Sequence, residues 1–133
     1  MKVLSLIEPW ASLIKEQIKY IETRSWKTNY RGKIYIHASL KKVPKKDERI
    51  NELISLLKSQ DFKYGHIIAE ATIVDCQYMD EEFLERIKEN KIEYLCGEYK
   101  VGRYAWILED IKPLQVPIKV KGSLGLWNYN END

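Results

Sequence analysis

Residues 3–26 read VLSLIEPWASLIKEQIKYIETRSW, and the pattern of these residues predicts a strand, a helix and an extended segment in turn. Val3–Ile7 is rich in branched apolar residues and predicts a short buried strand. Pro9 suits the first turn of a helix. Apolar residues then recur at helical spacing, which predicts an amphipathic helix over residues 9–18. Ile21–Trp26 predicts an extended segment, because its residues are β-prone and its polar and aromatic side chains follow a period of two.

The rest of the chain alternates short strands with two more helices. Asp47 and Asp80 are each placed to begin a helix, and Asn90 is placed to end the second one. Further strands are predicted at Lys33–Ala38, Ile67–Cys76, Tyr104–Leu108 and Val116–Val120, with a last ordered segment at Gly122–Tyr129. Without a strict βαβ repeat, this order predicts an α+β fold: a small, barrel-like sheet with about three helices.

Length and composition fit an ordinary globular protein. The chain has 133 residues, of which 44% are hydrophobic and 32% charged, so we predict one domain over residues 1–133. The longest apolar runs fall far short of the roughly 20 residues that cross a membrane. The N-terminus meets Glu8 and Pro9 too early for a secretory signal. We therefore expect a cytoplasmic protein without a membrane partner.

Charge is distributed unevenly along the chain. Residues 1–60 carry 13 basic and 6 acidic side chains, whereas residues 61–133 carry 9 and 14. A basic first half can attract a phosphate-bearing partner. The alternative is that the two halves fold together and their fields largely cancel, and the formal net charge of +2 is compatible with that.

Metal and cofactor sites are not indicated. Cys76 and Cys96 form no CxxC pair, and only His37 and His66 are available to join them, so the tightly spaced ligand pairs of zinc sites are absent. We expect two reduced thiols in or near the core. The sequence contains no phosphate-binding loop and no dinucleotide fingerprint, and we predict no cofactor.

The densest polar cluster follows the first predicted helix. Glu22 and Arg24 share one face of an extended segment, and Lys19 precedes them. A carboxylate between two cations stays ionised and holds both in fixed orientations. Such a pair of cations can receive a phosphate, a carboxylate or a polar base edge. The alternative is an ion-pair network that only closes the barrel.

Four tryptophans in a short chain suggest a further role in binding. Aromatic faces beside Arg and Lys stack the bases of single-stranded nucleic acid. Trp10 and Trp26 flank the charged cluster and are the better stacking candidates, whereas Trp106 lies in an apolar run and is predicted to be core. His37 lies on the polar face of its strand, where it is either a general base or a structural residue. Lys121 leads into the turn at Gly122–Gly125 and is placed to line a cleft rim.

Several motifs, taken in order, resemble the ASCH domain (activating signal cointegrator homology). They are Ser5–Ala11, Lys19-x-x-Glu22-x-Arg24-Ser25-Trp26, Tyr30-Arg31-Gly32, Ile36-His37-Ala38, Gly102–Trp106 and Lys121–Trp127. The resemblance covers nearly the whole chain. It implies a PUA-like fold, which is a small β-barrel with helices closing one end, and a cleft lined by a GxKxxExR signature. Gln17 stands where that signature has glycine, and we expect this departure to affect the turn after the helix rather than the cleft.

The resemblance also implies a function class. Members are mostly regarded as modules that bind RNA or other nucleic acids, some linked to translation or to transcription coactivation. Some relatives are amidohydrolases of acylated cytidine nucleosides, or ribonucleases. In the amidohydrolases a lysine acts with a threonine three residues later. Lys19 matches the lysine, but Glu22 occupies the threonine position, so a hydroxyl nucleophile is missing unless Thr23 supplies it.

We therefore predict a small module that binds RNA or a nucleotide in a charged cleft flanked by aromatic residues. The alternatives are a hydrolase with Lys19 as base and Glu22 as its acid/base partner, acting on an acylated cytidine or on RNA, and a domain that binds another protein. The predicted ligand-binding residues are Trp10, Lys19, Glu22, Arg24, Trp26, Arg31, His37, Lys121 and Trp127.

Overall fold

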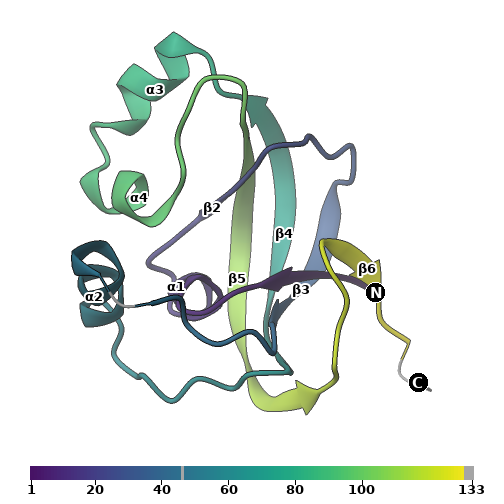
Figure 1. The fold of residues 1–133 in the computed structure, drawn as a ribbon. Helices are drawn as coiled ribbons and strands as arrows, with labels where there is room; N and C mark the ends of the chain where they lie inside the picture. The colour runs from purple at the N-terminus through teal and green to yellow at the C-terminus, as the bar shows by residue number, and fades with distance from the viewer. Residues whose placement is uncertain (46, 131–133) are drawn as a thin grey trace.

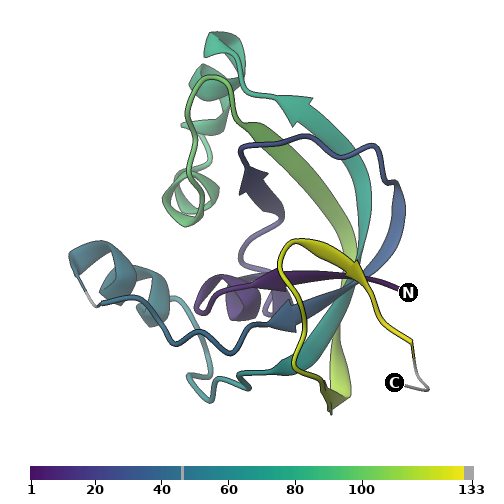
Figure 2. The ribbon, with the colours of Figure 1, turned by 45° about the vertical axis from the view of Figure 1, so that its right-hand side comes forward.

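A computed structural model describes residues 1–45 and 47–130; Lys46 and residues 131–133 lie outside the description. Its main feature is one six-stranded sheet in the order β2-β5-β4-β3-β1-β6, curled around helix α1 (Figures 1 and 2). Strands β1 and β3 are parallel, and the other neighbours are antiparallel. The elements are β1 (Lys2–Leu6), α1 (Trp10–Lys15), β2 (Ile21–Arg24), β3 (Gly32–Ala38), α2 (Glu48–Ser55), β4 (His66–Tyr78), α3 (Glu81–Ile87), α4 (Lys91–Cys96), β5 (Tyr104–Lys119) and β6 (Leu126–Asn128).

The predicted α+β class with a small curled sheet is confirmed. One strand in the last third of the chain is longer than the sequence predicts. The segments Tyr104–Leu108 and Val116–Val120 were predicted as two strands, and they belong to one strand, β5. Pro113 and Pro117 make the middle of β5 look like a break. In the structure β5 stays paired with β4 through three register shifts, and these irregularities bend both strands.

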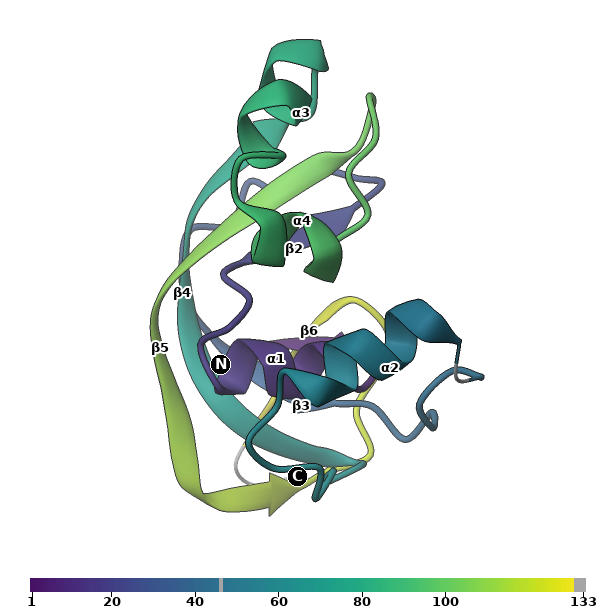
Figure 3. The ribbon, with the colours of Figure 1, turned by 90° about the vertical axis from the view of Figure 1, so that its left-hand side faces the viewer.

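Helix α1 packs against the sheet on one side and against a second hydrophobic cluster, built around α2, on the other. Its Ala11 and Ile14 are fully buried in the main core together with Trp106, which confirms the predicted core position of that tryptophan. Its Leu13 packs instead with Leu53 and the rest of the apolar stripe of α2. Figure 3 accordingly shows α1 and α2 side by side within the curve of the sheet, with α3 and α4 above them.

The described residues form four helices, whereas the sequence predicts about three. The helix without a prediction is α4. Asp80 caps α3 by accepting from the backbone N–H of Phe83 at 2.8 Å, as predicted. Asn90, expected to end that helix, instead caps α4 by accepting from the N–H of Glu93. Asparagine suits both ends of a helix, so the sequence alone did not separate the two roles. None of the helices described is long and apolar enough to cross a membrane.

Helix α1 is shorter than the predicted span of residues 9–18 because the backbone turns at Gln17. This residue has a φ of 61°, in the left-handed region that glycine adopts without strain. The turn carries the chain directly into Lys19 and β2. Gln17 thus occupies, with a side chain, the position where the resemblance predicted glycine.

Replacing Gln17 by glycine is expected to stabilise the protein. A left-handed conformation costs a residue with a side chain about 1–2 kcal/mol, and the extra freedom of glycine in the unfolded chain takes back about 0.5–1 kcal/mol. Urea unfolding of Gln17→Gly should therefore give a free energy of unfolding about 0.5–1 kcal/mol above that of the parent. Gln60→Gly is the matched control. Gln60 lies outside the left-handed region, so its glycine variant should be less stable, and a loss in Gln17→Gly would contradict the argument.

Candidate ligand-binding cleft

A cleft of about 840 Å³ opens where the curled sheet fails to close. The edge strands β2 and β6 are not paired with each other, so the sheet keeps a gap between β2 and the β1–β6 side. The cleft is lined by the end of β1, by β2 and the residues after it, by residues 39–41, by residues 96–98 at the end of α4, and by residues 121–125. Segments far apart in sequence therefore form its walls.

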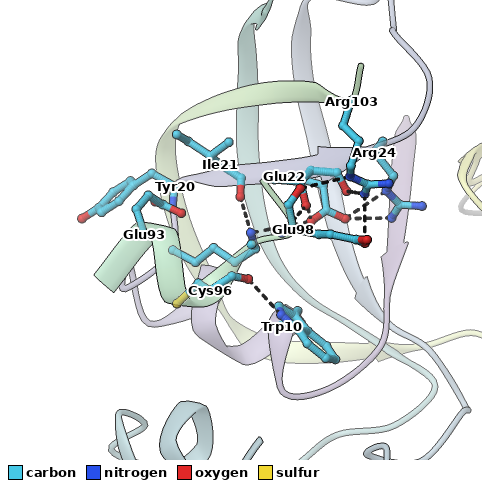
Figure 4. Close-up of polar contacts among 12 residues, drawn as sticks. Trp10, Tyr20, Ile21, Glu22, Arg24, Glu93, Cys96, Glu98 and Arg103 are labelled. Carbon is cyan, nitrogen blue, oxygen red and sulfur yellow. Dashed lines mark hydrogen bonds and ion pairs between the residues drawn. The ribbon is translucent and has the colours of Figure 1, made fainter. Parts of the chain in front are cut away.

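The centre of the cleft is a carboxylate held between two cations (Figure 4). Arg24 donates from Nε to Glu22 Oε2 at 3.0 Å, and its Nη2 lies 2.9 Å from the same oxygen. The Nζ of Lys19 lies 3.8 Å from Glu22 Oε1 and donates to the carbonyl of Ile21. The predicted arrangement, in which Lys19 and Arg24 flank the carboxylate of Glu22, is thus present. This carboxylate fixes the orientation of both cations.

Arg24 also joins the two sides of the gap in the sheet. Its Nη2 donates to the backbone carbonyl of Ser5, on β1, at 3.0 Å. Because β2 and β1 share no backbone hydrogen bonds, this guanidinium links them where a barrel would have a ladder. The side chain of Arg24 is 22% exposed, so it keeps a face toward the cleft.

Lys19 is the most enclosed member of the cluster. Its side chain is 1% exposed, although the residue lines the cleft. A second acid, Glu93 of α4, interacts with the charge of Lys19 and accepts from the backbone N–H of Tyr20. Burial raises the pKa of the Glu93 carboxyl, and the positive charge of Lys19 acts against that rise. No sequence signal pointed to Glu93, because α4 was not predicted.

Two further arginines reach the cleft from distant segments. Arg103 donates from Nη2 to the carbonyl of Thr23 at 3.2 Å and from Nε to the carbonyl of Glu98 at 3.0 Å. Arg49, on α2, donates to the carbonyl of Leu95, in the last turn of α4, and to that of Gly97, directly after the helix. The lining then carries six basic side chains against two acidic ones, which are Glu22 and Glu98; the basic ones are Lys19, Arg24, Lys41, Arg49, Arg103 and Lys121.

Trp10 and Trp26 both line the cleft, on different walls. The indole N–H of Trp10 donates to the carbonyl of Cys96 at 2.9 Å, which ties α1 to the end of α4. The ring of Trp26 meets the buried Trp106 edge-on, with centroids 4.7 Å apart and planes at 84°. The indole N–H of Trp106 donates to the carbonyl of Trp26 at 3.2 Å. Trp26 is therefore anchored while it remains 42% exposed.

His37 lines the cleft and holds a short hydrogen-bond chain. Its Nε2 lies 2.7 Å from the carbonyl of Val120. A carbonyl can only accept, so Nε2 carries the proton and Nδ1 accepts from the hydroxyl of Ser5 at 2.9 Å. The indole N–H of Trp127 donates to the same hydroxyl at 2.9 Å. Burial lowers the pKa of His37, which favours this neutral form.

Seven of the nine predicted ligand-binding residues line the cleft, and Arg31 and Trp127 do not. Arg31 donates to the carbonyls of Thr28 and Tyr30 and lies 3.9 Å from Asp75, so it supports a turn. Trp127 packs edge-on against His37. Both residues belong to motifs of the resemblance, and a motif does not show which side of the sheet a side chain takes. Within residues 1–45 and 47–130 no three His, Cys, Asp or Glu side chains are grouped to hold a metal ion.

Comparison with known proteins agrees with this architecture. The family model of the ASCH domain matches residues 4–118. The chain is 27% identical to activating signal cointegrator 1 of Homo sapiens and 26% identical to that of Mus musculus, over 96% of this chain. It spans only 22% of the length of each of these relatives. The crystal structure of ASCH from Zymomonas mobilis matches with a TM-score of 0.63 and 17% identity, over 98% of this chain and 88% of that one.

Removing the central carboxylate should cost far more than removing a surface one. In Glu22→Ala, Lys19 and Arg24 keep their charges without the group between them, and breaking a buried pair in this way costs about 3 kcal/mol. The Asp61–Lys63 pair is even shorter, at 2.8 Å, but exposed. Asp61→Ala should therefore leave stability unchanged in urea unfolding. Equal effects of the two substitutions would contradict a structural role for Glu22.

The buried imidazole of His37 should make stability depend on pH. Its pKa is lowered below 6.5, so the unfolded chain takes up this proton at a higher pH than the folded one. Stability is thus lost as the pH falls from about 6.5 through the folded pKa of His37. His37→Gln should show a smaller loss between pH 7 and 5, read as the shift of the urea midpoint. A His37→Gln variant that loses stability between pH 7 and 5 as steeply as the parent would contradict the assignment to His37.

Proposed function

The chain belongs to the ASCH domain family, and we propose that its cleft binds RNA or a nucleotide. The observation that carries this proposal is the braced pair of cations, Lys19 and Arg24, on one carboxylate inside a concave site. Because Glu22 fixes Arg24 with part of its guanidinium facing the cleft, an arriving phosphate meets a donor that needs little reorganisation. The enclosed Lys19 adds positive charge behind it. A role in translation or transcription regulation and a cytoplasmic location belong to the same proposal.

The charge of the cleft supports an anionic ligand. Among the described residues, Lys41 and Lys121 form no hydrogen bond or ion pair through their side chains, while the arginines around them are partly occupied by backbone carbonyls. Lysines with free ammonium groups act as point charges toward phosphate. We therefore assign Lys41 and Lys121 to phosphate contacts and the arginines to shaping the cleft as well as binding.

We favour binding over hydrolysis. The ammonium of Lys19 is bound by the carbonyl of Ile21 and by Glu22 and is almost without solvent exposure, which leaves it a poor base for a substrate. The hydroxyl of Thr23, the remaining candidate nucleophile, accepts from the N–H of Glu98 at 3.1 Å. We also rank a protein-binding role lower, because a concave basic site fits a small anionic ligand better than a flat protein surface.

Salt dependence of RNA binding tests the proposal. Fluorescence anisotropy with a short single-stranded RNA should show affinity that falls steeply with salt. Lys41→Ala and Lys121→Ala should each weaken binding and reduce the slope of log affinity against log salt by about 1. Lys112→Ala, on β5 and outside the cleft, is the matched control and should keep the slope.

Absence of binding at low salt would overturn the proposal, as would an unchanged slope in both cleft variants. Mass spectrometry of the RNA recovered from the titration should show it intact. Shortened RNA would instead support the ribonuclease alternative.

A further inference from the structure

Three exposed apolar side chains gather at the mouth of the basic cleft. Trp26 is 42% exposed, Leu40 53% and Leu124 96%, and all three line the cleft. A single exposed leucine on a protein surface is ordinary. Here the apolar groups share one site with six basic side chains. That combination favours a ligand with both apolar surface and negative charge.

Leu124 stands on a loop whose two ends are held. At Gly122, with a φ of 84°, an added Cβ would lie 2.3 Å from Cε1 of His37, so the backbone rests directly on that ring. At the other end, Gly125 has a φ of 66° and its carbonyl accepts from the N–H of Ser5 at 3.2 Å. Both glycines are therefore needed for the path of the loop, and this path leaves Leu124 almost fully in solvent.

The loop also lies against the anchored tryptophan. A Cβ on Gly125 would be 3.8 Å from Cζ2 of Trp26, which is ordinary van der Waals contact. Leu124 precedes Gly125 in this loop and lines the same cleft as Trp26. The ring of Trp26 is held by its edge-on contact with Trp106. An aromatic face and an aliphatic side chain thus border the same part of the cleft mouth.

A nucleobase fits this pair of side chains only when its faces are free. In a duplex the faces of a base are covered by its stacked neighbours, whereas a splayed base of a single strand can stack on an aromatic ring. Phosphates on either side of that base would meet the cations, with Lys121 directly before the loop. A ligand of phosphate alone would leave the apolar side chains in water.

We propose that Trp26 and Leu124 form a base-binding subsite, so that the ligand class is a single-stranded oligonucleotide with at least one unstacked base. This inference rests on the proposed function, and it adds that the cleft discriminates against duplex RNA. Leu124 acts as a specificity-determining residue, and the cations supply the part of the affinity that does not depend on the base.

The test compares three probes of about eight nucleotides: oligouridine, the same backbone without bases, and a blunt RNA duplex. Anisotropy at fixed salt should rank oligouridine first. Leu124→Ser should weaken oligouridine binding about tenfold and leave the abasic probe unchanged, because its side chain contacts only the base. Val116→Ser, at a residue 78% exposed on β5 and outside the cleft, should change neither affinity.

Trp26→Leu gives a second, independent reading. It keeps an apolar side chain against Trp106 and removes the aromatic face, so the loss should again be confined to oligouridine. Equal affinities for oligouridine, abasic probe and duplex, or a Leu124→Ser variant that binds oligouridine as the parent does, would overturn the base subsite while leaving anion binding intact. Absence of binding to all three probes at low salt would overturn the proposed function as well.

Discussion

The carboxylate of Glu22 is the group on which the rest of the site depends. The Nζ of Lys19 lies 3.8 Å from one oxygen of this carboxylate and Nη2 of Arg24 lies 2.9 Å from the other, so the carboxylate offsets the repulsion between the two cations. With it, Arg24 is oriented to reach the carbonyl of Ser5 and to connect β2 with β1. The sheet therefore keeps a gap that is bridged by one side chain rather than closed by a strand ladder. The cleft occupies that gap. The ion pair of Glu22 and Arg24 at its centre is also the pair that holds the two sides together.

The features that could be predicted from the sequence are those that depend on residues close together in the chain. The period of two in β2 places Glu22 and Arg24 on one face, and Asp80 caps its helix, because both features depend on residues only a few positions apart. Arg49 and Arg103 could not be found in this way. Their approach to the cleft depends on where α4 ends and where β5 begins, and each of these follows from the packing of segments that lie some fifty or more residues away. Contacts of this kind leave no local pattern.

Gln17 and Arg31 show the two ways in which a motif informs. The signature position of Gln17 is explained by its left-handed backbone, because the turn into β2 needs that conformation whatever side chain is present. The motif therefore reports a backbone requirement, and Gln17 itself is not among the residues that line the cleft. Arg31 belongs to a motif with an equally regular spacing, yet its guanidinium binds the carbonyls of its own turn. Conformation can be inferred from such a pattern more safely than a ligand contact.

The cationic and the apolar side chains that line the cleft contribute to recognition in different ways. Cations whose positions are fixed by backbone carbonyls attract any polyanion, and that attraction weakens as salt is added. Apolar side chains such as Leu124 respond to the shape and exposure of a base, and their contribution is nearly independent of salt. Raising the salt should therefore lower the affinity for oligouridine and for the abasic probe alike, while the ratio between the two affinities persists. A cleft with cations alone would give a ratio near one at every salt concentration, so this ratio separates a site that reads unpaired bases from one that binds only phosphate charge.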